Sequence, residues 1–544
     1  MTTSTKTFSN KQASKPLGPS VKMKAENARK IGLFGAICVI VGSVIGIGAF
    51  IKNKSVFANN YGNPYGVLLS WGIAFIIAFA TAFSYAEITR VKTRIANTGL
   101  AGWSERYVGY NFGRFLKITY SFFYYSCKLF IMSLILGELF FCINPFYNNN
   151  GTPEITNQNM WSIWGIGFGI SLIMLIANWI NNYAITKSMT FITPIKFLPI
   201  LLVVIFGVLG GVKTNGGLFN PTNFGPDQTY AGEFSITSVF SSLPAIMFAF
   251  DSFLVVGNVS ENVNNPTRNI PISIIISMSI CGIIYFLIAI SQLLCGQPTP
   301  YGVFQEIFKN NEAAKTTFTV TVSIFMAVSE FGVVTSISSA FINSTQAAIN
   351  EEVIIGSRIM KKISNGSKNK LTGGFIMSLI IVTFWFIVLG VPSAVLNTDQ
   401  IFDGFSNIIV VLFFTIYGFV VLMSIINRIT NKIPQSEVPR QKGHVVFASI
   451  SVLGCFLVPL YQMIYEFIYK VVLNPTGEYK PWGLFWGGSR IPTWIACLVF
   501  WFGVIIFVAF PFINDMLIKV TNKNYSQALM WQKVKVNKAI KVKK

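Results

Sequence analysis

The chain has 544 residues, of which 52% are hydrophobic and only 11% are charged, and its mean hydropathy is +0.57. Because a soluble domain usually carries about 25% charged residues, this composition excludes an ordinary soluble protein and predicts an all-α integral membrane protein. The formal net charge of +22 does not indicate nucleic acid binding, since the cations lie in the tails and between long apolar runs.

Twelve apolar runs are long enough, at about 20 residues each, to cross a bilayer as helices. In chain order they lie near 31–51, 64–88, 115–143, 161–180, 191–212, 237–258, 271–296, 317–349, 373–391, 401–427, 445–473 and 491–518. Lys and Arg concentrate in the tails 1–30 and 519–544 and in loops such as 350–372, which predicts that these segments are cytoplasmic. We therefore expect a multi-pass protein in the lipid bilayer of a bacterial plasma membrane, with both termini inside.

The first run, 31–51, contains Gly42, Gly46 and Gly48 within seven residues. Each glycine weakens a helix by roughly 0.5–1 kcal/mol relative to alanine. A helix that unwinds at membrane depth must bury its free backbone groups in protein or line a cavity with them. We interpret this stretch as a broken helix whose free N–H and C=O groups can hold a zwitterion or an ion. Close packing of helices through small residues is the alternative.

The sixth run shows a second interruption, in "SSLPAIMFAFDSFLVVGNVSEN" at 241–262. Pro244 and the pair Asp251–Ser252 interrupt it, and a mid-span carboxylate costs about 2.5–3.5 kcal/mol unless it has a partner or a task. The first and sixth runs open two units of five spans, 31–212 and 237–427, which are followed by two more spans within 445–518. An odd number of spans reverses the second unit, so the spacing predicts inverted repeats.

Four segments in order resemble motifs of the amino acid–polyamine–organocation (APC) superfamily of permeases. They are "GSVIGIGAF" (42–50), "FSYAEI" (83–88), "GLAGWSERYVGYNFGRF" (99–115) and "FAFDSFLVVGNVSENVNNPTRNIP" (248–271). The chain departs from the family pattern at Ser252, where glycine is usual, at Ala49, where isoleucine is usual, and in lacking an arginine-rich end to the eighth helix.

The resemblance implies a leucine-transporter-type fold of 12 transmembrane helices, in which ten core helices form a 5+5 inverted repeat and two are peripheral. It implies a substrate site between helices one, three, six and eight, with the substrate carboxylate at the amides of Ile47 and Gly48, near Ser43. The implied partners of the substrate ammonium are the carbonyls of Ile45, Phe248, Ala249 and Asp251. Phe253 is the implied aromatic gate, and the small Gly46 and Gly48 let the ligand reach the backbone. Ser252 belongs to the same motif.

Four further ionisable residues lie within or near the spans. Lys128 in the third span and Glu330 in the eighth lie at similar depths, so we expect either a buried pair or separate packing roles. Lys196 resembles the fifth-helix lysine that takes the place of a sodium ion in proton-coupled or sodium-independent relatives; reaching to the cytoplasmic surface is its alternative role. Glu138, near the outer end of the third span, is predicted to be interfacial.

These features predict a secondary transporter that moves amino acids by alternating access, without sodium and with protons as the coupling partner. A cationic amino acid or polyamine exchanger is the alternative within the class, because Asp251 and Glu330 offer counter-charges. A membrane sensor or channel on the same scaffold is the alternative outside it. His444 is the only histidine and the sequence contains no P-loop motif, so we expect no enzyme activity, no cofactor, no metal site and no ATP-driven pumping.

Overall fold

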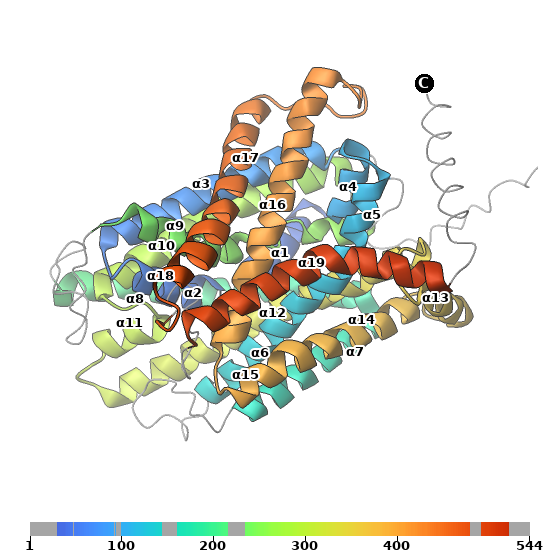
Figure 1. Cartoon of the computed structure of the whole chain (residues 1–544). Helices are drawn as coiled ribbons and strands as arrows, with labels where there is room; N and C mark the ends of the chain where they lie inside the picture. The colour runs from blue at the N-terminus through green and yellow to red at the C-terminus, as the bar shows by residue number, and fades with distance from the viewer. Residues whose placement is uncertain are drawn as a thin grey trace, which may run out of the picture.

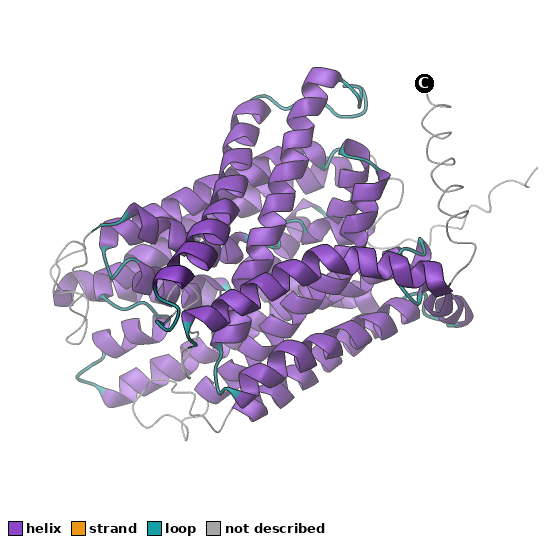
Figure 2. Ribbon diagram, in the orientation of Figure 1, coloured by secondary structure: helices purple, strands orange, loops and turns teal. Residues whose placement is uncertain are grey.

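The computed structural model describes residues 30–46, 48–91, 93, 99–143, 160–215, 234–478 and 491–521. Within them the regular elements are helices, and the only bridges are isolated ones, Ile31 with Val263 and Glu478 with Pro492 (Figure 2). Helices satisfy every backbone hydrogen bond inside one segment, which is why apolar runs of this length adopt them in lipid. The predicted all-α membrane fold is confirmed.

The helices follow one another in the order shown in Figure 1. The first half contains α1 (Leu33–Val44), α2 (Gly48–Asn59), α3 (Pro64–Ile88), α4 (Gly99–Tyr107), α5 (Tyr110–Thr119), η1 (Tyr120–Tyr124), α6 (Tyr125–Ile143), α7 (Met160–Ile195) and α8 (Phe197–Asn215). The second half contains α9 (Ile236–Phe250), η4 (Val255–Asn262), α10 (Pro266–Cys295), α11 (Pro300–Ile307), α12 (Glu312–Asn350), α13 (Ser357–Gly366), α14 (Thr372–Trp385), η5 (Phe386–Gly390), α15 (Val391–Val395), α16 (Gln400–Thr430), α17 (His444–Tyr461), η6 (Gln462–Tyr469), α18 (Lys470–Leu473) and α19 (Thr493–Thr521).

Eleven helical segments of the described chain are long and apolar enough to cross a membrane. The first expected span is not among them, because it consists of the two short helices α1 and α2, so the count of twelve stays a prediction. The fourth and fifth spans share α7, which turns at Asn181 (φ −148°, ψ 78°). The Asn181 side chain caps the second half of α7 by accepting a hydrogen bond from the amide of Ala184 at 3.0 Å.

Both predicted helix breaks are present. Helix α1 ends in the extended residue Ile45 (φ −76°, ψ 97°), and α2 begins at Gly48. Helix α9 ends in the extended Asp251, and the next helix begins only at Val255. The interruption expected at Pro244 is wrong, since α9 continues through this residue; a proline removes only one backbone donor, and flanking turns can absorb that loss in a packed helix.

The third and sixth spans lie in the centre of the bundle and the last two lie at its edge. The apolar windows of Tyr110–Phe140 and Ile236–Ser260 are each 94% buried, whereas that of Thr493–Thr521 is 28% buried. Exposed side chains on α19, such as Ile505 and Phe512, are apolar, as expected for a face in contact with lipid. The bundle of helices with two broken members at its centre is a leucine-transporter-type fold, and its division into ten core and two peripheral helices stays a prediction. The inverted relation of 31–212 to 237–427 stays a prediction.

The predicted topology can be tested by cysteine labelling. Loop 144–160 carries no Lys or Arg, and all but its last residue lies outside the described part of the chain, whereas Asn365 lies on α13. In a background without reactive native cysteines, we expect a membrane-impermeant thiol reagent applied to whole cells to label Asn149→Cys and to spare Asn365→Cys until the cells are permeabilised. The reverse pattern would overturn the orientation.

Candidate functional site

The backbone carbonyls at the end of α1 are bonded by side chains from three other helices. Lys196 donates from Nζ to the carbonyls of Gly42 (2.6 Å) and Ile45 (2.8 Å), and Ser329 lies 3.4 Å from the Ile45 oxygen. The Tyr285 hydroxyl lies 2.9 Å from the carbonyl of Val44 and 3.1 Å from that of Ala249, so it spans both helix breaks. The Ile45 oxygen thus lies within hydrogen-bond distance of two side chains of the protein, and the substrate roles of Ile45 and Ala249 stay predictions.

Lys196 lies between the first and eighth helices, and its role in coupling stays a prediction. Lys196 is the single residue between the end of α7 at Ile195 and the start of α8 at Phe197. Its side chain is fully buried. Gly332 of α12 makes room for it, because an added Cβ there would lie 2.9 Å from the Lys196 Cε atom. Snorkelling to the cytoplasmic surface is therefore wrong for this lysine.

Asp251, at the break in the sixth span, has three buried donors. Lys128 of α6 forms an ion pair with its Oδ2 atom at 2.5 Å. The Tyr124 hydroxyl donates to Oδ2 at 2.9 Å, and the Tyr417 hydroxyl of α16 donates to Oδ1 at 3.0 Å. Lys128 therefore pairs with this carboxylate on the sixth span, and the pair with Glu330 that similar depth suggested stays a prediction. Depth does not report which way a side chain points around its helix.

Ser252 explains one departure from the family motif. It adopts φ +75°, the left-handed region that favours glycine. Its hydroxyl accepts a hydrogen bond from Lys128 Nζ at 2.7 Å. The serine therefore supplies a ligand for the buried ammonium at a position where glycine would supply none, and this compensates for the backbone strain.

Glu330 lies against the broken first helix. It is fully buried, and a Cβ added at Gly46 would lie 2.8 Å from both Glu330 Oε2 and Val333 Cγ2. A Cβ added at Gly48 would meet Phe248 only at 3.4 Å, an ordinary van der Waals contact. Gly46 thus leaves less room for a side chain than Gly48 does, because α12 packs against it.

This difference predicts unequal effects of two matched substitutions. Gly46→Ala forces Glu330 and Val333 to move, and such overpacking typically costs about 1–3 kcal/mol. We expect at least a ~10-fold loss of transport for Gly46→Ala, equivalent to about 1.4 kcal/mol, and a smaller loss for Gly48→Ala. Uptake by equal amounts of folded protein, checked by size-exclusion chromatography, measures this. Equal losses would contradict the close approach at Gly46.

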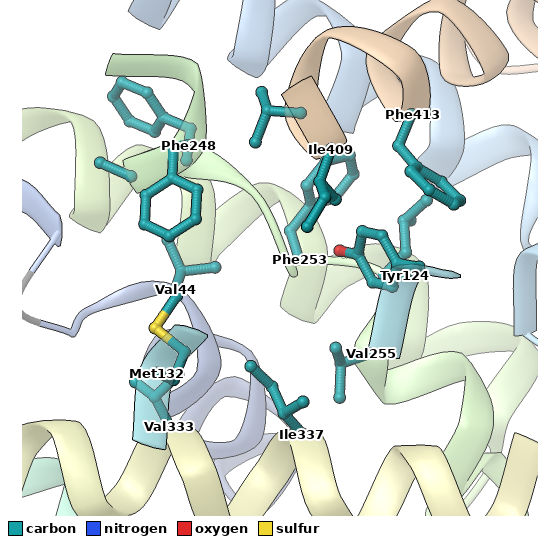
Figure 3. Packing of buried hydrophobic residues seen from close by; sticks show 14 of the residues in the cluster. Val44, Tyr124, Met132, Phe248, Phe253, Val255, Val333, Ile337, Ile409 and Phe413 are labelled. Atoms are coloured by element: carbon teal, nitrogen blue, oxygen red, sulfur yellow. The ribbon is translucent and has the colours of Figure 1, made fainter. Parts of the chain in front are cut away.

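Buried apolar side chains pack together around the two helix breaks, as Figure 3 shows. Among the labelled side chains are Val44, Phe248, Phe253 and Tyr124, together with Val333 of α12. Phe253 is fully buried, and its ring centroid lies 6.1 Å from that of Tyr85 and 5.8 Å from that of Tyr417. Its role as a gate stays a prediction. Ser43 is buried, and its hydroxyl bonds the Val39 carbonyl of its own helix at 2.7 Å. Ile47 lies outside the described residues.

The structure also shows a second buried ion pair that the sequence analysis missed. Lys52 of α2 pairs with Asp403 of α16 and also donates to Ser406 (2.8 Å) and Asn407 (2.9 Å). Both charged side chains are at most 1% exposed. Lys52 and Asp403 each lie at the end of an apolar run, where a charged residue is normally interpreted as lying at the membrane interface. One signal in the sequence could have predicted this pair: Lys52 and Asp403 carry opposite charges, and they lie at the ends of the first and tenth spans that are predicted to face the same side of the membrane.

A small cavity lies beside the broken helices, between α1, α7, η4 and α12. Its lining residues are apolar on three of these elements and hydroxylated on α12: Val39, Ile185, Met189, Val255, Val259, Thr335, Ser336 and Ser339. It lies toward the end of the bundle predicted to be cytoplasmic, on the far side of the breaks from Lys52 and Asp403.

Comparison with known proteins identifies similar chains. The family model described as "Amino acid permease" matches residues 31–532. The human cystine/glutamate transporter is 26% identical over 326 residues, which cover 58% of this chain and 60% of that protein. The rabbit (Oryctolagus cuniculus) b(0,+)-type amino acid transporter 1 is 25% identical, covering 50% of this chain and 52% of that one. This chain thus spans 60% or less of the length of these curated relatives.

One solved structure covers more of the chain. The crystal structure of MhsT in complex with L-phenylalanine aligns with 79% of this chain and 97% of that chain, at 15% identity and a TM-score of 0.49.

Proposed function

Because the chain belongs to the amino acid permease family, we propose that it is a secondary transporter that moves amino acids across the cell membrane by alternating access. The observation that carries the proposal is the pair of helix breaks, at residues 45–48 and 251–254, with the Tyr285 hydroxyl within hydrogen-bond distance of the carbonyl of Val44 beside the first and of Ala249 beside the second. Free backbone groups at two such breaks suit a ligand that carries both an ammonium and a carboxylate.

The charges around the breaks favour a substrate without net side-chain charge. Two lysines, Lys128 and Lys196, face two carboxylates, Asp251 and Glu330, so the site is neutral when all four are ionised. Asp251 already accepts from three protein donors. A cationic amino acid or a polyamine would have to displace Lys128 from it. This supports a zwitterionic amino acid over the cationic alternative.

The position of Lys196 supports transport without sodium. A sodium site needs oxygen ligands and no fixed positive charge, and here an ammonium group bonds the carbonyls of Gly42 and Ile45. Opening the cleft between α1 and α12 to water would change the affinity of Lys196 for its proton. A proton bound with different affinity in two states is what thermodynamic coupling requires.

The two ends of the bundle differ in a way that alternating access requires. The Lys52–Asp403 pair ties α2 to α16 on the side predicted to face outward. The cavity between α1, α7, η4 and α12 lies on the other side. Movement of the broken helices would exchange which side is closed.

Uptake by the purified protein in proteoliposomes tests the proposal. We expect saturable uptake of at least one zwitterionic amino acid from a labelled panel, undiminished when sodium is replaced by choline and driven by an imposed pH step. Saturable uptake with no sustained bilayer current separates a transporter from a channel. A strict sodium requirement would contradict the role of Lys196, and failure to transport any amino acid would contradict the proposal itself.

A further inference from the structure

Glu138 is a buried carboxylate to which the proposed transport route assigns no role. Its side chain is fully buried in α6, five residues before the helix ends, and neither carboxylate oxygen has a hydrogen-bond partner among the described residues. Its position at the depth of the membrane interface stays a prediction, but the side chain itself lies within the protein. An ionised carboxylate that is buried without a partner costs several kcal/mol, so the protonation state of Glu138 needs an explanation.

The charged groups that act on Glu138 come from two neighbouring helices. They are Asp399 and Asp403 at the start of α16 and Lys54 of α2. Lys52 lies next to them, because it pairs with Asp403. Together with Glu138 this makes three carboxylates and two lysines, which leaves one negative charge in excess if all five groups are ionised. One bound proton makes the group neutral.

The proton belongs on Glu138 rather than on either aspartate. Asp399 and Asp403 lie at the N-cap and in the first turn of α16, where the helix dipole stabilises negative charge. Asp403 also accepts from Lys52. Glu138 lies inside α6, has no donor and gains nothing from a helix N-terminus.

We propose that Glu138 is a proton-binding residue, which holds a proton while the Lys52–Asp403 pair closes this end of the bundle and releases it when that end opens. On opening, the O–H bond of the carboxylic acid breaks and the proton passes to an entering water molecule, which leaves a solvated carboxylate. Only the opening step rests on the proposed function.

Infrared spectroscopy tests the bound proton without any transport. In the purified full-length protein, the carbonyl stretching band of a protonated carboxylic acid should lose intensity in Glu138→Gln. Glu466→Gln is the matched control, because Glu466 is an equally buried glutamate that is bonded by Lys470 at 2.9 Å, and it should leave the band unchanged. An unchanged band in Glu138→Gln would overturn the proposal.

Transport measurements test the release. Glutamine mimics the protonated acid, so Glu138→Gln should fold, bind substrate and lose part of the dependence of uptake on external pH, which for one proton amounts to at most about tenfold per pH unit. Glu138→Asp, which retains a carboxyl group, should restore that dependence. If uptake by Glu138→Gln depends on external pH in the same way as uptake by wild type, the proposed release of the proton is wrong. If wild-type protein transports no amino acid, the proposed function fails while the infrared result still decides whether Glu138 binds a proton.

Discussion

Replacing Lys196 with alanine is expected to stop concentrative uptake while changing substrate affinity by less than about tenfold. The ammonium bonds two carbonyls of the broken first helix and does not occupy the amides proposed for the substrate carboxylate. Its loss removes the group whose protonation would differ between the two states. Without such a difference a proton gradient exerts no force on the transport cycle.

The measurement compares accumulation and binding in the same preparation. Proteoliposomes loaded without sodium receive an imposed pH step, and the internal substrate level is compared with the external level. Lys187→Ala is the matched control, since Lys187 is an exposed lysine of α7, the helix that ends just before Lys196. We expect the control to accumulate substrate like wild type and Lys196→Ala to reach only equal concentrations. If the wild-type protein exchanges substrate and does not respond to the pH step, Lys196 has only a structural role.

Replacing Lys128 with methionine is expected to destabilise the protein by about 3–5 kcal/mol, because it leaves the Asp251 carboxylate buried without its counter-charge. The ion pair measures 2.5 Å, and both side chains are at most 1% exposed. Methionine keeps much of the length of the lysine side chain, so the effect reports the charge more than a cavity. Asp251→Asn should also destabilise, because it leaves the ammonium of Lys128 buried without its counter-charge.

A double substitution distinguishes the ion pair from separate packing roles. Lys128→Met combined with Asp251→Asn removes both charges, and we expect it to be more stable than Lys128→Met alone, as judged by thermal unfolding in detergent. Additive losses would mean that the two residues act independently. Competition by lysine and leucine for uptake in Asp251→Asn adds a substrate readout: a selective loss of about 2–5 kcal/mol for lysine would revive the cationic alternative.

The sequence alone determined the class of fold and the two sites of helix breakage. Hydropathy reports which segments lie in lipid, and lipid permits only structures that satisfy their own backbone, so most apolar runs became helices near the expected bounds. Gly42, Gly46 and Gly48 weaken the first of these helices locally, and a carboxylate at Asp251 marks the second break. Both signals act within a few residues, which is why a linear pattern contains them.

The tertiary structure alone decided which buried charges meet. Lys128 and Asp251, or Lys52 and Asp403, lie far apart in the chain and become partners only through the packing of different helices. Position along a helix gives the depth of a side chain, but its direction depends on how that helix is rotated and tilted against its neighbours. For this reason the sequence did not show that Lys128 meets Asp251 or that the Glu138 side chain is buried among the helices.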